Sequence, residues 1–227
     1  GVDIARGDIL DRASIASALD GCDTLFHAAA LYDLWGLDAA EQIAFTYVEK
    51  GLPVVCVNPA GIYGPGDRKP TGRFIVSLLN GWIPALYPGW MSLVYIDDAV
   101  QGHLLAADKG QIGARYILSG TVDTLTALGG LACRLAGRWP PLTIPAPLAA
   151  PYAMGGEALS LLTRRPPVLS WETYRLAAHG FRADGSKAAG ELGLHYTDRE
   201  QGLAQTINWC WEQGLLKRRP ACAKLAS

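Results

Sequence analysis

The stretch best suited to chemistry is Asn58-Pro59-Ala60-Gly61-Ile62-Tyr63-Gly64-Pro65-Gly66-Asp67, which follows an apolar run from Leu52 to Val57. The β-branched residues of that run predict a short strand buried on both faces of a parallel sheet. Pro59 cannot donate to a ladder, and the glycines allow close backbone approaches, so we expect the strand to stop there. Ligands in open α/β sheets bind just beyond the carboxyl ends of such strands. The stretch is therefore either a small-molecule site or a plain exit from a strand.

Other residues that could perform chemistry have simpler structural explanations. His27 lies in an apolar strand pattern, where a histidine is more often a packed core residue than a catalytic base. Asp97 and Asp98 precede a predicted helix, so one of them is expected to be its N-cap rather than half of an acid–base pair. No serine or cysteine lies at a persuasive spacing from the other histidines, which are His103, His179 and His195. We assign no catalytic residue and no metal ligand.

An aromatic-rich turn contains Trp82, Tyr87 and Trp90. Clustered aromatic side chains in loops face a substrate in some proteins and cover the edge of a core in others. The sequence leaves both interpretations open.

Five short motifs occur in order along most of the chain. They are GDILD at Gly7–Asp11, LFHAAALYDLW at Leu25–Trp35, VVCVNPAGIYGPGD at Val54–Asp67, LVYIDD at Leu93–Asp98 and DGSKAAGELG at Asp184–Gly193. In their order and spacing these motifs resemble the extended short-chain dehydrogenase/reductase superfamily, also called the NAD-dependent epimerase/dehydratase superfamily. Within it they are similar to dihydroflavonol 4-reductase-like proteins and hopanoid-associated sugar epimerases.

The resemblance implies a fold of the α/β class. Its sheet would be a doubly wound parallel (Rossmann-type) sheet, accompanied by a smaller, mostly helical substrate lobe. We expect residues 1–118 to form the dinucleotide-binding domain. Residues 119–227 are expected to form mainly the substrate lobe and a C-terminal helix.

The resemblance also implies a cofactor, NAD or NADP, held by three parts of the chain. Asp8 and Ile9 match positions that touch adenine, and Ala28, Ala29 and Ala30 match the backbone surface under the ribose and pyrophosphate. Pro59, Ala60, Gly61 and Ile62 match the loop beside the nicotinamide, where a rigid backbone orients the ring. Taken without the resemblance, Asp8 is a turn residue and the alanines are close-packing residues.

The implied function is that of an NAD(P)-dependent oxidoreductase. Such an enzyme transfers hydride between the nicotinamide and a carbonyl or hydroxyl carbon of a small, and in one version aromatic, substrate. A first alternative is an NAD-dependent nucleotide-sugar epimerase, which returns the hydride. A second alternative, from another class, is a non-catalytic dinucleotide-binding regulator.

Two parts that the resemblance calls for are not in the sequence. The glycine-rich turn after the first strand would precede Gly1, and the fifth strand with the catalytic Tyr-x-x-x-Lys helix would lie between Trp35 and Glu41. No Tyr-x-x-x-Lys occurs anywhere in the 227 residues. We expect the sequence to join separated pieces of a longer protein, with a break between Leu34 and Ala40. The alternative is a degenerate, inactive chain.

Periodicity predicts the elements that position these motifs. Strands are expected at 2–5, 24–30 and 115–118, and helices at 41–50, 74–79, 99–108 and 125–135. Near the C-terminus Ser186 is expected to cap a short helix closed by Gly193, and the spacing of Thr197 and Glu200 is that of a capping box. The buried stripe of the last helix is predicted to be Leu203, Ile207 and Trp211.

Composition limits the class of protein and its partners. Half of the residues are hydrophobic and 18% are charged, which is typical of a globular chain. A formal net charge of -1, without a basic tract, predicts no nucleic-acid partner and no attraction to anionic membranes. Prolines interrupt the most apolar window, Leu142–Leu162, so no membrane span is predicted. Five scattered cysteines indicate neither disulfides nor a zinc site, and they favour a location in the cytoplasm. A homodimer is a further expectation for the assembly.

Overall fold

The computed structural model describes residues 37–163 and 182–224, together with Ala13, Ser17, Trp171, Tyr174, Arg175, Ala178 and Gly180. The strands predicted at 2–5 and 24–30 lie outside these residues, as do residues 34–36 of the window 34–40. Residues 37–40 form the first turn of a continuous helix, α2 (Leu37–Thr46). The prediction of a break in that window is therefore confined to residues 34–36, where it stays a prediction.

The sheet is built around strand β1 (Cys56–Pro59), which pairs in parallel with β5 (Arg115–Leu118). The prediction that the strand stops at Pro59 is confirmed, because Pro59 is the last residue of β1. The strand begins only at Cys56, later than the apolar run suggested. The N–H groups of Cys56 and Ala60 donate to carbonyls of the β5 segment at 3.0 and 2.9 Å. Residues alternate along a strand, so the nitrogen of Pro59 points away from β5 and its missing hydrogen removes no bond of this ladder.

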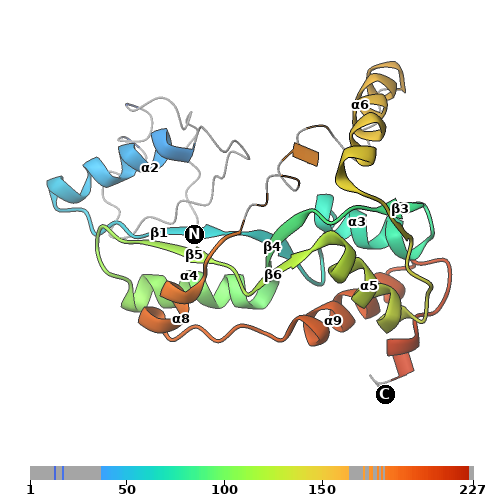
Figure 1. Ribbon diagram of the computed structural model, residues 1–227. Coiled ribbons are helices and arrows are strands. Elements are labelled where there is room, and N and C mark those ends of the chain that lie inside the picture. The colour runs from blue at the N-terminus through green and yellow to red at the C-terminus, as the bar shows by residue number, and fades with distance from the viewer. Residues whose placement is uncertain are drawn as a thin grey trace.

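A second group of strands continues from the first. The chain runs from β1 into β2 (Gly61–Tyr63) and from β5 into β6 (Thr121–Thr124), and β4 (Trp90–Tyr95) is parallel to β2 and antiparallel to β6. Leu93 of β4 is opposite both Gly61 and Thr121. The two extended segments are therefore paired as far as Pro59 and Leu118 and then separate, with β4 between them (Figure 1).

Helices cover both faces of the β1–β5 pair. Helices α4 (Ile96–Lys109) and α8 (Ser186–Leu192) lie on one face and α2 on the other, so the strands form the middle layer (Figure 1). Val55 and Val57 pack towards α4 and α8, whereas Cys56 packs against Ala44 of α2. This arrangement confirms the predicted α/β class and the strand buried on both faces. A short 3₁₀ turn, η1 (Val48–Lys50), follows α2, so the helix expected at 41–50 begins earlier and ends sooner.

The largest core cluster lies under β2, β4 and β6. Three helices fill it: α3 (Pro70–Leu79), α5 (Leu125–Ala136) and α9 (Arg199–Glu212). The predicted stripe of the last helix is confirmed for Leu203 and Ile207, both fully buried, whereas Trp211 is only partly buried. The small parallel pair β3 (Ala85–Leu86) and β7 (Leu142–Thr143) and the 3₁₀ turn η2 (Ala221–Lys224) lie at the same end of the molecule.

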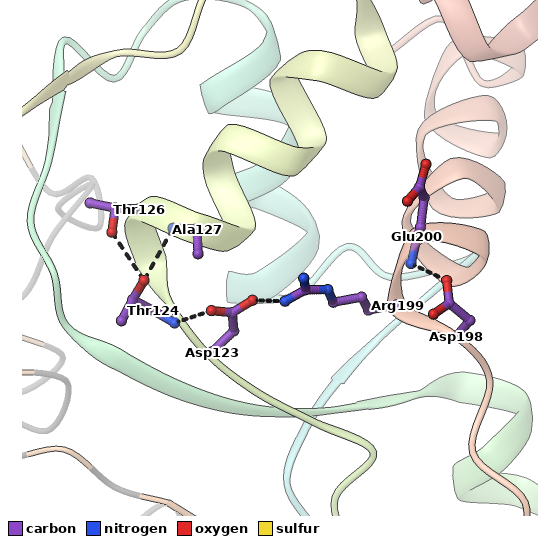
Figure 2. A network of polar contacts seen from close by, with 7 residues as sticks. All are labelled: Asp123, Thr124, Thr126, Ala127, Asp198, Arg199 and Glu200. Atoms are coloured by element: carbon purple, nitrogen blue, oxygen red, sulfur yellow. Dashed lines mark hydrogen bonds and ion pairs between the residues drawn. The ribbon is translucent and has the colours of Figure 1, made fainter.

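The N-terminus of α9 corrects one capping prediction. Its N-cap is Asp198, whose carboxylate accepts from the N–H groups of Glu200 and Gln201. Arg199, the first residue of the helix, forms an ion pair with Asp123 of β6, and the neighbouring Thr124 caps α5 (Figure 2). Polar contacts at their first turns thus hold the starts of α5 and α9 to the same end of β6. Thr197, the predicted cap, has another role described below.

Two other predictions near α8 and α6 are also corrected. Ser186 is the first residue of α8 rather than its cap, and Asp184 accepts from its N–H at 2.9 Å, whereas Gly193 does close the helix at φ 70°. Helix α6 (Ala146–Thr163) continues through Pro151, which was expected to interrupt it. In the described part of the chain, no helix is long and apolar enough to span a bilayer.

Candidate functional site

The centre of the candidate site is the passage from β1 to β2, residues 59–62, where the backbone changes its partner. Ala60 lies between the two strands, and its N–H donates to the carbonyl of Leu118 at 2.9 Å. One residue later, Gly61 is opposite Leu93 of β4. The four predicted nicotinamide-loop residues therefore have a backbone held by neighbours on both segments. They form a rigid, extended surface rather than a loose loop.

Gly61 is required at this passage by close packing. A Cβ atom there would lie 2.9 Å from Leu93 Cδ2 and 3.2 Å from the carbonyl oxygen of Ser92. The same position is 4.0 Å from the hydroxyl oxygen of Thr71 in the first turn of α3. The passage is thus bounded by β4 on one side and by the start of α3 on another.

A buried carboxylate anchors the strand end just before the passage. Glu41 of α2 is 5% exposed, accepts a hydrogen bond from the Asn58 amide and forms an ion pair with Arg115 of β5. The amide oxygen of Asn58 is buried and has no hydrogen-bond partner. Burial, followed by the Glu41 charge, raises the pKa of the Cys56 thiol. The result is a strand end with one fixed negative charge and one unused acceptor.

Glu41 was not recognised as a site residue in the sequence, although a signal existed. Glu41, Ala44 and Val48 are spaced so that they share one helix face, and Ala44 and Val48 belong to the apolar cluster against β1. An acidic residue on an apolar stripe is rare unless it is paired. Its partners, Asn58 and Arg115, could not be predicted from the sequence because they come from two other elements.

The turn after β2 is structural. Asp67 Oδ1 accepts the N–H of Lys69 at 2.7 Å and so supports the start of α3, whose N-cap residue makes no side-chain cap of its own. Gly66, at φ 89°, supplies the left-handed conformation that the turn needs. The glycines and Asp67 of the motif therefore shape the chain between β2 and α3.

The aromatic residues of the predicted turn divide into three environments. Tyr87 is buried beside Tyr174, with ring centroids 5.5 Å apart, and Tyr174 stacks on Trp171 at 5.3 Å. Trp90 lies under the guanidinium of Arg182 at 3.7 Å. Trp82 is 55% exposed. Tyr87 thus joins a core cluster, which agrees with the core interpretation of the turn, whereas the substrate-facing interpretation stays a prediction.

The hydroxyl of Tyr87 has an unusual environment. The atom is buried and has no hydrogen-bond partner. Burial, with the neighbouring Tyr174, raises the pKa of Tyr87 to about 12. The side chain sits in a cluster with Leu125 and Ala149, against which Phe74 of α3 packs. Phe74 is about one helical turn from Thr71, so the cluster begins close to the passage at Gly61.

The aspartate pair and the described histidines do not form a catalytic group. Asp97 and Asp98 lie in the first turn of α4, whose N-cap is Tyr95, so the predicted N-cap role is wrong. Asp98 is buried and accepts from the N–H and hydroxyl of Thr197 at 2.8 and 2.6 Å. The Nδ1 atom of His103 forms a hydrogen bond within α4 to the carbonyl oxygen of Ala99 at 2.7 Å. No group of metal-ligating side chains occurs among the described residues.

Five of the nine predicted cofactor residues cannot be placed. Pro59 to Ile62 lie together at the passage, but the others lie outside the described residues: Asp8, Ile9, Ala28, Ala29 and Ala30.

Comparisons with known proteins give several relatives, although no family model matches the chain. Sterol demethylase protein B of Methylococcus capsulatus is 35% identical, and the match covers 95% of this chain and 87% of that protein. A candidate dihydroflavonol 4-reductase of Synechocystis sp. is 32% identical over 78% of this chain, which spans 54% of that protein. The crystal structure of a nucleoside-diphosphate-sugar epimerase from Pseudomonas aeruginosa superposes with a TM-score of 0.62 at 29% identity, covering 87% of this chain and 62% of the epimerase.

The first of these matches bears on the segment predicted to be missing between Leu34 and Ala40. Its alignment extends over 284 positions, more than the 227 residues of the whole chain. The Methylococcus protein therefore has residues within the aligned stretch for which this chain has no counterpart.

Proposed function

The chain belongs to the extended short-chain dehydrogenase/reductase superfamily, and from this premise we propose that the intact protein is a dihydroflavonol 4-reductase-like, NAD(P)-dependent oxidoreductase. It transfers hydride between the nicotinamide and a carbonyl or hydroxyl carbon of a small substrate. The observation that carries the proposal is the passage at Pro59–Ile62, a rigid backbone surface at the carboxyl end of a buried parallel strand.

The residues at the passage fit a nicotinamide in two respects. Gly61 brings the backbone of β2 against β4 without an intervening side chain, so the extended segment is held flat. The unused amide oxygen of Asn58 is an acceptor at the strand end, and a carboxamide N–H is a donor of the kind that it lacks. When bound, the cofactor supplies the hydride, and the chain holds one face of the ring towards the substrate. We propose that Asp8 and Ile9 contact the adenine and that Ala28–Ala30 lie under the ribose and pyrophosphate.

The substrate side is proposed to be the aromatic cluster around Tyr87. Its apolar walls come from α3, α5 and α6, and its one unsatisfied polar atom is the Tyr87 hydroxyl. Such a cluster suits a small apolar or aromatic body that carries a hydrogen-bonding group. On this proposal residues 119–227 contribute mainly to the substrate side. The names of two relatives refer to sterols and to a dihydroflavonol, both of which are molecules of this kind.

Cofactor titration tests the proposal. In the protein made from its complete coding sequence, tryptophan fluorescence is expected to respond to NAD(H) or NADP(H), and reduced cofactor should be consumed with a ketone substrate. A preference for NADP(H) with net turnover supports the reductase. Tight binding of NAD without its net consumption would indicate the epimerase instead. No fluorescence response at millimolar cofactor would contradict the assignment as an enzyme.

A non-catalytic dinucleotide-binding regulator is the second candidate. The observation favouring it is that no Tyr-x-x-x-Lys occurs in the 227 residues. The complete coding sequence separates the two candidates, since the regulator requires that the pair be absent there as well.

Location and assembly belong to the same proposal. Within the described part, Cys56, Cys133, Cys210 and Cys222 are buried free thiols, which suits a reducing cytoplasm. We also propose a homodimer. Sedimentation velocity would test the dimer.

A further inference from the structure

One end of the molecule carries exposed tryptophan and arginine side chains together. It consists of residues 78–86, 134–142 and 213–221, which we name the Trp–Arg face. Trp139 is 95% exposed, Leu142 is 75% exposed and Trp82 is 55% exposed. Single exposed apolar residues are ordinary, but two tryptophans and a leucine on adjoining segments are not.

Contacts join the three segments into one surface. Lys217 lies over the ring of Trp82 at 5.1 Å, and the guanidinium of Arg138 donates to the carbonyl of Arg218 at 2.7 Å. Leu142 donates its N–H to the carbonyl of Pro84 at 3.2 Å, directly before the β3–β7 pair. Trp139, between Arg138 and Leu142 in the chain, is therefore fixed beside the other two segments. Pro140 and Pro141 follow it and stiffen the backbone that presents the indole.

The face is positively charged although the whole chain is nearly neutral. The three segments contain five cationic residues, Arg134, Arg138, Lys217, Arg218 and Arg219, and no aspartate or glutamate. The prediction from net charge that there is no attraction to anionic surfaces overlooked this local excess. A cluster of this size acts within a Debye length, about 8 Å at physiological salt, whatever the total charge of the protein.

We propose that the Trp–Arg face is a docking surface for an anionic lipid bilayer. Indole rings favour the boundary between headgroups and acyl chains because one part of the ring is apolar and the N–H is polar. Lysine and arginine beside them add attraction to acidic headgroups. The face has both components side by side, because Lys217 lies over Trp82 and Arg138 precedes the exposed Trp139. The protein thereby binds at the membrane surface without spanning it.

Cosedimentation with vesicles tests the proposal. The purified protein should bind phosphatidylcholine vesicles that contain phosphatidylserine, and should bind pure phosphatidylcholine vesicles at least tenfold more weakly. Binding should fall steeply as salt shortens the Debye length to about 3 Å. Each cation removed is expected to weaken binding roughly fivefold, so Lys217→Glu with Arg218→Glu should weaken it more than tenfold.

Two variants separate insertion from charge and from misfolding. Trp139→Ser removes an almost fully exposed ring, so its unfolding midpoint should equal that of the wild type, while vesicle binding falls and quenching by brominated lipid is reduced to the part that comes from Trp82. The matched control is Lys109→Glu with Ile112→Ser, an exposed cation and an exposed apolar residue (62%) near the start of β1 at the other end of the molecule. The control should bind as the wild type does.

Three outcomes would overturn the proposal. They are equal binding to neutral and anionic vesicles, equal binding by the face variants and the control, and binding of the wild type to single-stranded RNA or an acidic protein but not to vesicles. Cofactor binding is measured separately, so none of these outcomes depends on the oxidoreductase assignment.

Discussion

At the scale of single residues, Glu41 is the side chain on which the candidate site depends most. Its carboxylate is buried between Asn58 and Arg115, and a charged hydrogen-bond acceptor there joins α2 to β1 and β5. Glu41→Gln keeps the shape of the side chain but removes its charge. Arg115, whose side chain is about half exposed, would then be solvated by water in place of its ion pair. We expect a loss of about 1 to 2 kcal/mol in the free energy of unfolding.

Urea unfolding measures this loss. The exposed Glu49 supplies a matched control, because Glu49→Gln should change the free energy by less than about 0.5 kcal/mol. Equal effects of the two substitutions would mean that Glu41 is not an anchor.

Cys210 gives a prediction for the dependence of stability on pH. Burial, and then the nearby Asp67 charge, raises the pKa of this thiol from 9.0 to about 11. Because the folded value is higher, the protonated thiol stabilises the fold fully below pH 9, and this contribution is lost as pH rises towards 11. The loss should be on the order of 2 to 3 kcal/mol.

Unfolding curves on either side of pH 9 test the prediction. Cys210→Ala should start from lower stability and lose less of it with rising pH. The slope should not vanish, since the buried Tyr87 also has a raised pKa. An unchanged slope in the variant would rule out Cys210 as a source of the pH dependence.

At the scale of elements, the passage from β1 to β2 makes the sharpest functional prediction. Pro59→Arg places a large charged side chain where the nicotinamide is proposed to lie, and the new N–H points away from β5, so the fold should survive. Turnover in the intact protein should fall on the order of a hundredfold. Pro53→Arg, at an exposed position before β1, is the control. Unchanged steady-state kinetics in Pro59→Arg would remove the passage from the site.

The start of α9 tests how much each polar contact contributes. Asp198 caps two backbone N–H groups, whereas Arg199 makes a half-exposed ion pair with Asp123 (Figure 2). Asp198→Ala should cost about 1 kcal/mol, and Arg199→Ala should cost less than about 1 kcal/mol, as surface pairs usually do. Thermal denaturation of both variants shows which substitution causes the larger loss of stability. A larger loss from Arg199→Ala would show that the ion pair, not the cap, fixes this helix.

The elements that the sequence predicted well are those whose signals are local. In α3, α5 and α9 the helical spacing of apolar residues can be read within ten to fourteen consecutive residues. Asn80 and Gly137 mark the ends of α3 and α5. The partners of β4 could not be predicted, because β2 has only three residues and β4 pairs with β2 on one edge and with β6 on the other, both of them distant in the sequence. Adjacent Thr197 and Asp198 can both cap a helix, and only the distant Asp98 decides that Thr197 does not.

At the scale of the whole molecule, the sequence predicted the superfamily and its sheet but only part of the site. The passage at Pro59–Ile62, proposed to hold the nicotinamide, could be predicted because its residues are consecutive. The Glu41–Asn58–Arg115 group was not, because its members come from three elements and meet only when the sheet forms.

The junction predicted between Leu34 and Ala40 is a property of the whole chain. The Methylococcus relative has residues without a counterpart here, and β1 has no strand partner on its edge away from β5 within the described residues. We predict that the complete coding sequence holds a further strand and a Tyr-x-x-x-Lys helix at this point. Sequencing across the junction tests this, and an uninterrupted reading frame would favour the non-catalytic regulator.

The most direct test of the central claim is a methyl NMR titration of Ile62 in the intact protein. The nicotinamide ring should shift the Ile62 methyl signals when NAD(H) or NADP(H) binds, because ring currents act only over short distances. ADP-ribose, which lacks the nicotinamide, should leave them nearly unchanged, and Ile112, exposed near the end of α4, should not respond to either ligand. Equal responses of Ile62 to the dinucleotide and to ADP-ribose, or no response to saturating cofactor, would contradict the placement of the nicotinamide at Pro59–Ile62.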